Sequence, residues 1–144
     1  MITLFDPEWI IARLKTEVPT LKFVGGSAEL AVAEADLKQT PSAYVFEAGD
    51  DASENTTGTM VVSQQNKVRF VVAIATMNFR DSRGQHAGAD MRTIRTAILN
   101  ALHAWSPDNE FNPIEKRSGR LIKMSKAVLW RREEFVTSHL IRSV

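Results

Sequence analysis

The segment KVRFVVAIATMNF (residues 67–79) decides the fold. From Val68 to Ile74 its residues are nearly all apolar. Such a run is typical of a strand that is covered on both faces. We therefore predict a central strand at this point, with helices packed against one of its faces.

The residues on the N-terminal side of this segment predict further strands. TMVVSQQ (residues 59–65) reads as a partner strand, joined tightly near Asn66, because asparagine tolerates the left-handed conformation of a hairpin turn. The preceding GDDASENTTG (residues 49–58) is polar, acidic and rich in turn formers, which predicts a mobile loop. Before it, SAYVFEA (residues 42–48) follows Pro41 and predicts another strand.

Three segments predict helices. Asp6-Pro7-Glu8 begins a helix that runs to about Val18, and SAELAVAEADL (residues 27–37) favours a second, shorter one. Ser82-Arg83-Gly84-Gln85 fits a capping box at the start of the longest helix, which ends at Ser106-Pro107.

The C-terminal part predicts three strands. An irregular strand near FNPIEKR (residues 111–117) is followed by a turn at Ser118-Gly119. RLIKMSKAVLWR (residues 120–131) and EEFVTSHLIR (residues 133–142) then pair as a hairpin. Trp105 and Trp130 each follow an apolar run, so we expect both to anchor the core.

Length and composition indicate one soluble globular domain over residues 1–144. The chain is 44% hydrophobic and 24% charged, close to the average for such proteins. It contains no cysteine, which excludes disulfides and thiolate metal sites. We expect no signal peptide and no membrane segment, because no apolar run approaches the roughly 20 residues that span a bilayer.

The charge is unevenly distributed along the chain. Residues 1–58 carry 4 basic and 10 acidic side chains, and residues 59–144 carry 14 basic and 7 acidic ones. One interpretation is that the two halves pack together and neutralise each other. The other is that an acidic surface of one subunit meets a basic surface of the next, as a head-to-tail ring requires.

No catalytic or cofactor motif is recognisable. His86, His103 and His139 are not spaced like metal ligands, so structural roles are favoured for them. Asp108 and Glu115-Lys116 resemble a nuclease metal site only loosely, because the lysine directly follows the glutamate. We therefore expect no enzyme activity, no metal and no cofactor.

A basic cluster supports a competing interpretation, a small nucleic-acid-binding module. Against it, the formal net charge is only +1, and charges that alternate along a hairpin are typical of one solvated sheet face. The cluster comprises Lys116, Arg117, Arg120, Lys123, Lys126, Arg131 and Arg132.

The order of landmarks over nearly the whole chain resembles that of bacteriophage tail terminator proteins. The likeness is carried by VPTLKFVGGSAEL, TPSAYVFEAG, FVVAIATMNFRD, the helix end ALHAWSP, Gly119-Arg120-Leu121 and VLWRREEF. Many members have glycine before the helix-ending tryptophan, where this chain has Ala104.

The resemblance implies an α+β domain: a mixed or antiparallel sheet, two to three helices packed mainly on one face, and a C-terminal β-hairpin. It also implies a ring of six copies at the head-proximal end of the virion tail, assembled in the host cytoplasm. The expected partners are other copies of this chain, the tail tube protein, the neck or head-completion protein and, in a contractile tail, the sheath protein. DNA is expected only in transit through the ring.

Two segments and one arginine pair are the candidate assembly interface or channel lining. The acidic segment can face the tube or the channel, or it can be a free solvent loop. The strand-to-helix segment can bridge subunits, although Asp81 can equally cap the helix. The residues are Asp50, Asp51 and Glu54, then Arg80, Asp81 and Arg83, and finally Arg131 and Arg132. A neck or head-completion protein of the same particle remains the nearest alternative.

Overall fold

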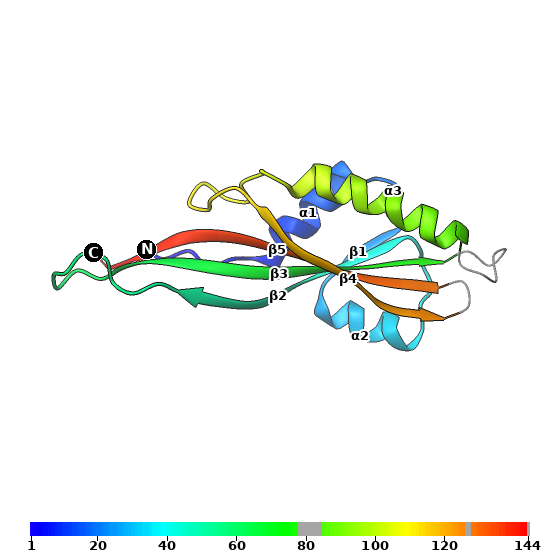
Figure 1. Cartoon of the computed structure of the whole chain (residues 1–144), viewed down its shortest axis with the longest axis horizontal. Coiled ribbons are helices and arrows are strands. Elements are labelled where there is room, and N and C mark those ends of the chain that lie inside the picture. The colour runs from blue at the N-terminus through cyan, green and yellow to red at the C-terminus, as the bar shows by residue number, and fades with distance from the viewer. Residues whose placement is uncertain (78–84, 126–127, 144) are drawn as a thin grey trace.

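The computed structural model describes residues 1–77, 85–125 and 128–143. Figure 1 shows a five-stranded sheet with helices on both faces. The strands lie in the order β1 (Phe23–Gly25), β2 (Ser42–Ala52), β3 (Ser63–Met77), β5 (Val128–Arg142) and β4 (Glu115–Ser125). β1 is parallel to β2 and the other neighbours are antiparallel, so the mixed-sheet α+β class is confirmed.

Helix α1 (Pro7–Glu17) forms as the sequence predicts. The Asp6 side chain accepts a hydrogen bond from the Glu8 backbone N–H at 2.9 Å, which satisfies one free donor of the first turn. Ile10 and Leu14 are spaced to share one face of the helix and are fully buried.

Helix α3 (Gln85–Leu102) is the longest helix, as predicted, and lies beside α1 on the same face of the sheet (Figure 1). Ile94 and Ile98 face the sheet and pack in the main core around Phe70 and Phe135. The capping box predicted at residues 82–85 depends on Ser82, which lies outside the described residues.

Helix α2 (Ser27–Ala35) covers the opposite face of the sheet (Figure 1). It contributes Ala33 to a second, smaller core with Tyr44 and Trp130. Trp130 is therefore a core residue as predicted, and Trp105 is half-buried against the main core, with the Arg13 guanidinium 4.8 Å above its ring. Two helices thus cover one face and the third covers the other.

The turn predicted near Asn66 is wrong. β3 runs without interruption from Ser63 to Met77, and Asn66 pairs with Ala52 on one side and His139 on the other. Asn66 is buried, and its side-chain amide has partners on both neighbouring strands. This hydrogen bonding outweighs the preference of asparagine for turns. The hairpin turn lies farther back, at residues 53–62.

The loop predicted at residues 49–58 lies farther along the chain, at residues 53–62. β2 continues through Ala52 after a bulge between Glu47 and Gly49. Asp50 and Asp51 therefore lie on a strand, and only Glu54 of the three acidic candidates lies in the connecting loop.

The C-terminal strands are also longer and fewer than predicted. Ser118 and Gly119 pair with Glu134 and Glu133 inside β4 and form no turn. β5 runs straight through Arg131 and Glu133, where the hairpin turn was expected. β4 and β5 are therefore the two strands of the C-terminal hairpin, paired from Glu115 to Ser125 with two bulges.

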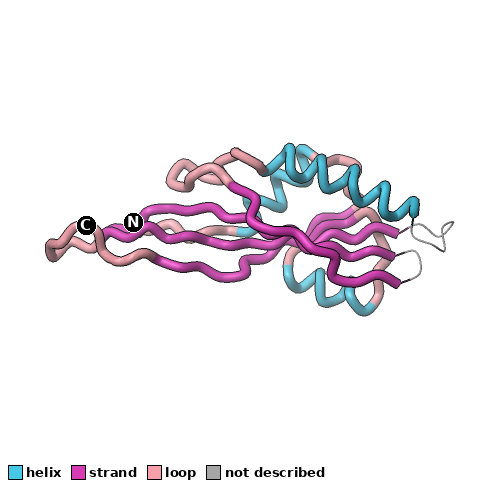
Figure 2. The backbone as a smooth tube through the Cα atoms, viewed as in Figure 1, coloured by secondary structure: helices cyan, strands magenta, loops and turns pink. Residues whose placement is uncertain are grey.

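Residues 49–69 form what we call the arm, in which β2 and β3 extend past the helices alongside the end of β5 (Figures 1 and 2). Both chain termini lie near the tip of the arm (Figure 1). The molecule thus consists of a helix-covered body and a projecting three-stranded ribbon.

Candidate assembly surfaces

The outer edge of β2 is acidic. β1 pairs with β2 only at Ser42, Ala43 and Tyr44, and beyond them no described strand pairs with this edge. The exposed side chains of Glu47, Asp50 and Asp51 follow along it. Partial burial, reinforced by the charge of Asp50, raises the pKa of Glu47 above its usual value. A cation from another chain would relieve this repulsion.

Two of these acids are fixed by contacts across the sheet. Asp51 Oδ2 lies 3.5 Å from Arg69 Nη2 on β3. Asp50 Oδ2 accepts a hydrogen bond from Asn66 Nδ2 at 3.1 Å, and the same amide contacts His139 Nε2 at 3.1 Å. His139 is buried and stacks on Phe111, with ring centroids 4.3 Å apart. The acidic edge is therefore part of an ordered strand.

The loop at the tip of the arm is hydrogen-bonded to itself. The Asn55 side chain accepts hydrogen bonds from the backbone N–H groups of Thr57 and Ser63, at 3.2 and 3.0 Å. The Thr57 hydroxyl donates to the Val61 carbonyl. These bonds hold Met60 at the tip, 98% exposed.

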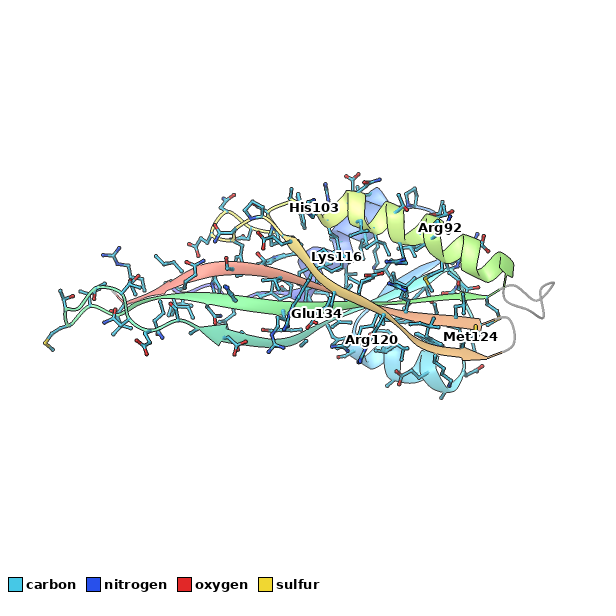
Figure 3. All side chains as sticks on the ribbon, viewed as in Figure 1. Arg92, His103, Lys116, Arg120, Met124 and Glu134 are labelled. Carbon is cyan, nitrogen blue, oxygen red and sulfur yellow. The ribbon has the colours of Figure 1, made fainter. Side chains whose placement is uncertain are left out.

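The outer edge of β4 is basic and partly apolar. Lys116, Arg120 and Lys123 lie along it, and no described strand pairs with it. Figure 3 shows Lys116, Arg120 and Met124 spaced along this strand. Leu121, Ile122 and Met124 are 50%, 51% and 61% exposed. Exposed apolar residues on an unpaired edge mark a surface that another chain can cover.

A hollow of about 370 Å³ lies beside this edge, on the sheet face that carries α2. Phe46 and Trp130 line it, and the positive charge of Arg120, Lys123 and Arg132 there exceeds the negative charge of Glu34, the one acidic lining residue. The Arg132 guanidinium lies 5.9 Å from the centroid of the Phe46 ring. This hollow suits a partner that carries acidic groups.

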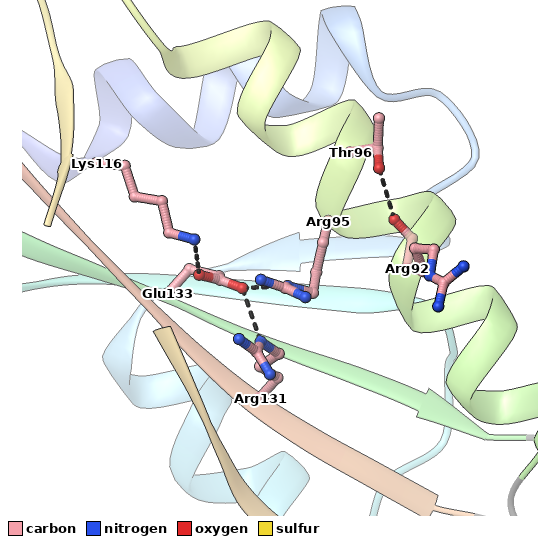
Figure 4. A network of polar contacts seen from close by, with 6 residues as sticks. All are labelled: Arg92, Arg95, Thr96, Lys116, Arg131 and Glu133. Carbon is pink, nitrogen blue, oxygen red and sulfur yellow. Dashed lines mark hydrogen bonds and ion pairs between the residues drawn. The ribbon is translucent and has the colours of Figure 1, made fainter. Parts of the chain in front are cut away.

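The opposite sheet face carries a buried carboxylate that the sequence analysis missed. Glu133 is 1% exposed, and its Oε1 accepts hydrogen bonds from the Nε atoms of Arg95 and Arg131, the latter at 2.8 Å (Figure 4). Its Oε2 accepts no hydrogen bond from any described residue and lies 3.6 Å from Lys116 Nζ. Burial alone would raise the pKa of Glu133, but the two arginine hydrogen bonds and the charges of Arg95 and Lys116 lower it.

Gly119 is the sequence signal of this buried site. It lies opposite Glu133 in the β4–β5 register. A Cβ atom at this position would fall on Glu133 Oε2, with Cδ at 3.0 Å and Arg131 Nη2 at 3.1 Å. The glycine therefore leaves room for the carboxylate and its arginine, which explains why a strand interior contains it.

The structure separates two candidate residues that are adjacent in the sequence. Arg131 lies on the α3 face with Glu133, whereas Arg132 lies on the α2 face over Phe46. Arg80, Asp81 and Arg83, and also Lys126 of the basic cluster, lie outside the described residues. Asp50, Asp51 and Glu54 all lie on the arm.

The described residues of the basic cluster do not form one continuous stripe. Its described side chains are divided between the two faces of the hairpin, and Arg117 is paired with Glu134 at 3.5 Å.

The two described histidines differ in exposure: His103 is exposed and His139 is buried. Among the described residues, no group of three His, Cys, Asp or Glu side chains can hold a metal ion. None of the described helices is both long and apolar enough to cross a bilayer.

Within the described residues, direct pairs between the two halves of the chain do little to neutralise the uneven charge. Among the described residues, only the pair Arg69–Asp51 joins residues 1–58 to residues 59–144. The acidic edge of β2 and the basic edge of β4 lie at opposite sides of the sheet. The structure therefore leaves both charged edges available to other chains.

Comparisons with known proteins identify the family. A chain from the virion of the native gene transfer agent (GTA) particle is similar at 15% identity and a TM-score of 0.42, over 93% of this chain and 84% of that one. No curated protein sequence matches. The family model described as phage tail terminator protein matches residues 1–143. The chain therefore belongs to the phage tail terminator protein family and is a structural component of a phage tail.

Proposed function

We propose that this protein forms a ring that caps the tail tube, ends tube polymerisation and offers the surface to which the head or neck attaches. The observation that carries the ring is that one sheet has an acidic edge on β2 beyond Tyr44 and a basic edge on β4, and no described strand covers either. A closed ring needs two different complementary surfaces on each subunit, and these two edges meet that requirement. By family resemblance, the ring contains six copies.

Termination needs an asymmetric ring. One of its faces must match the end of the tube while the other does not, so that no further tube subunit finds a template. The acidic arm residues Asp50, Asp51 and Glu54 act in assembly contacts or along the channel. There their negative charge keeps DNA in transit from binding.

The arginine candidates have different roles in this assembly. Arg132, at the hollow, is placed to receive an acidic group, and Arg131 positions Glu133. Arg80, Asp81 and Arg83 are proposed as subunit bridges from the family resemblance alone. No bond is made or broken in this function, and no cofactor takes part.

Electron microscopy of particles that lack this protein tests the proposal. We expect overlong or headless tails, together with heads that form normally. Tails of normal length together with heads that leak DNA would instead assign the chain to the neck. Headed, properly measured tails in its absence would refute both roles.

A gel-shift assay separates the tail role from nucleic-acid binding. At physiological ionic strength we expect little binding, because the described basic residues are divided between two faces and partly paired with glutamates. A tight complex that weakens steeply with salt would instead support a DNA-binding module.

A further inference from the structure

The end of β4 exposes apolar side chains on an edge strand. Natural edge strands are usually shortened, covered or charged where they would otherwise be apolar. Here Leu121, Ile122 and Met124 are half or more exposed on a strand whose outer edge is unpaired among the described residues. Main-chain hydrogen bonds and apolar contact are together what strand addition supplies.

The charges select the partner. A second β4 would bring Lys116, Arg120 and Lys123 against a copy of themselves, and like charges across strands are destabilising. Two acidic β2 edges would repel each other for the same reason. The acidic edge of β2 opposite the basic edge of β4 is the combination that places opposite charges together.

We propose that β4 of one copy pairs with the outer edge of β2, residues 45–52, of the next copy, so that the sheet continues from subunit to subunit. This inference rests on the ring proposed above. It goes further by assigning the subunit contact to two named strands and by making that contact main-chain pairing reinforced by charge.

The strand directions and faces agree with this pairing. β2, β3, β5 and β4 alternate in direction, so a copy rotated about an axis that runs along the strands presents β2 antiparallel to β4. When Asp51 lies opposite Arg120 in this antiparallel register, Glu47 lies beside Met124 on the α1–α3 face, since their sheet partners Phe70 and Leu129 both lie in the main core. Asp51 is held by Arg69 on the other face, which carries Arg120, Lys123 and the hollow.

Charge reversal tests the contact in tail assembly. The acidic-edge variant is Glu47→Lys with Asp51→Lys, and the basic-edge variant is Arg120→Glu with Lys123→Glu. Each alone should lower the yield of headed tails at least about 100-fold when it replaces the wild-type protein, because like charges then meet in every subunit contact. Both pairs in one chain restore opposite charges and should recover the yield to within about tenfold.

A control matched to the basic-edge variant has the same change in net charge at another surface. Lys15→Glu with Lys22→Glu alters two exposed lysines away from both edges and should leave the yield unchanged. The melting temperature of each purified variant should stay within about 3 °C of wild type, since the altered side chains are exposed or half-exposed. Wild-type yield from both edge variants, or no recovery in the fourfold variant, overturns the inference.

Cross-linking gives a second readout that does not depend on assembly yield. Because the chain has no cysteine, Asp51→Cys combined with Arg120→Cys, or with Lys123→Cys, introduces one thiol on each edge. In oxidised tails, at least one of these combinations should give a ladder of disulfide-linked copies on a non-reducing gel, and Asp51→Cys with Lys22→Cys should give none. Monomers only, from both test combinations in tails of normal appearance, would contradict strand pairing but leave the capping function intact.

Discussion

Replacing Gly119 with alanine should destabilise the monomer through the buried Glu133. The added Cβ falls on the Glu133 carboxylate, which cannot move away easily because Arg95 and Arg131 hold it at a site with 1% exposure. Either the carboxylate shifts and its arginine hydrogen bonds weaken, or β4 moves away from β5. Both outcomes lower the free energy of unfolding.

The size of the effect follows from the two costs involved. Overpacking costs about 1–3 kcal/mol, and complete loss of one partner of a buried ion pair costs about 3–5 kcal/mol. Because the side chains of Arg95, Arg131 and Lys116 are 26%, 23% and 35% exposed, they can relax toward water. We therefore expect about 2–3 kcal/mol, which lowers Tm by roughly 5–10 °C in a chain of this length.

A double-mutant cycle isolates the contact. In a Glu133→Ala background the carboxylate is gone, and Gly119→Ala should cost less than about 0.5 kcal/mol or become stabilising, since alanine suits a strand better than glycine. Urea and thermal unfolding of the four proteins measure the coupling. Gly58→Ala serves as a comparison without a contact: Gly58 has a φ of 65° and no atom within 4 Å of an added Cβ, so its cost reports backbone strain alone. Equal costs of Gly119→Ala in both backgrounds would refute the reasoning.

Three further outcomes are expected. Burial lowers the pKa of His139, although Asp50, Glu110 and the Thr3 backbone oppose this. The contribution of His139 to the free energy of unfolding should therefore be fully present above the pKa of about 6.5 that histidine has in the unfolded chain, and should be lost as the pH falls below it. His139→Gln should flatten this pH dependence in unfolding curves measured from pH 7.5 to 5. Ala104 has a φ of 65°, a conformation that costs a residue with a Cβ about 1 kcal/mol, so Ala104→Gly should raise Tm by about 2–4 °C; no rise would show that no strain is stored there. Replacing Asp50, Asp51 and Glu54 by serine should change the stability of the monomer by about 1 kcal/mol or less while impairing tail assembly, and wild-type tail yield would exclude a role for these acids.

The sequence predicted well those elements whose signal lies within their own residues. Helix α1 followed from the Asp6 cap and the spacing of Ile10 and Leu14, and both are seen in the structure. The central strand followed from the apolar run at Val68–Ile74, which lies inside β3 with strands on both sides. Local capping and burial are sufficient to specify such elements.

The errors arose where a distant partner overrides local preference. Asn66 and Gly119 are both turn formers, yet Asn66 is retained in a strand by Asp50 and His139, and Gly119 by the space that Glu133 needs. The buried network around Glu133 joins α3, β4 and β5, so no sequence spacing reveals it. By contrast, the glycine that many relatives have at the position of Ala104 has a local explanation, the left-handed conformation at this point.

The uninterrupted β3 makes the arm stiff. Its 15 residues run from the loop at the tip of the arm to the layer beneath α3, a span of about 50 Å at the usual rise per residue. β3 pairs with β5 from Ser63 to Met77 and with β2 from Asn66 to Ala75, so it resists bending, and we expect a displacement of Met60 at the tip to be transmitted toward Ile74 in the body. A displacement at one end of the molecule can in this way be transmitted to the other.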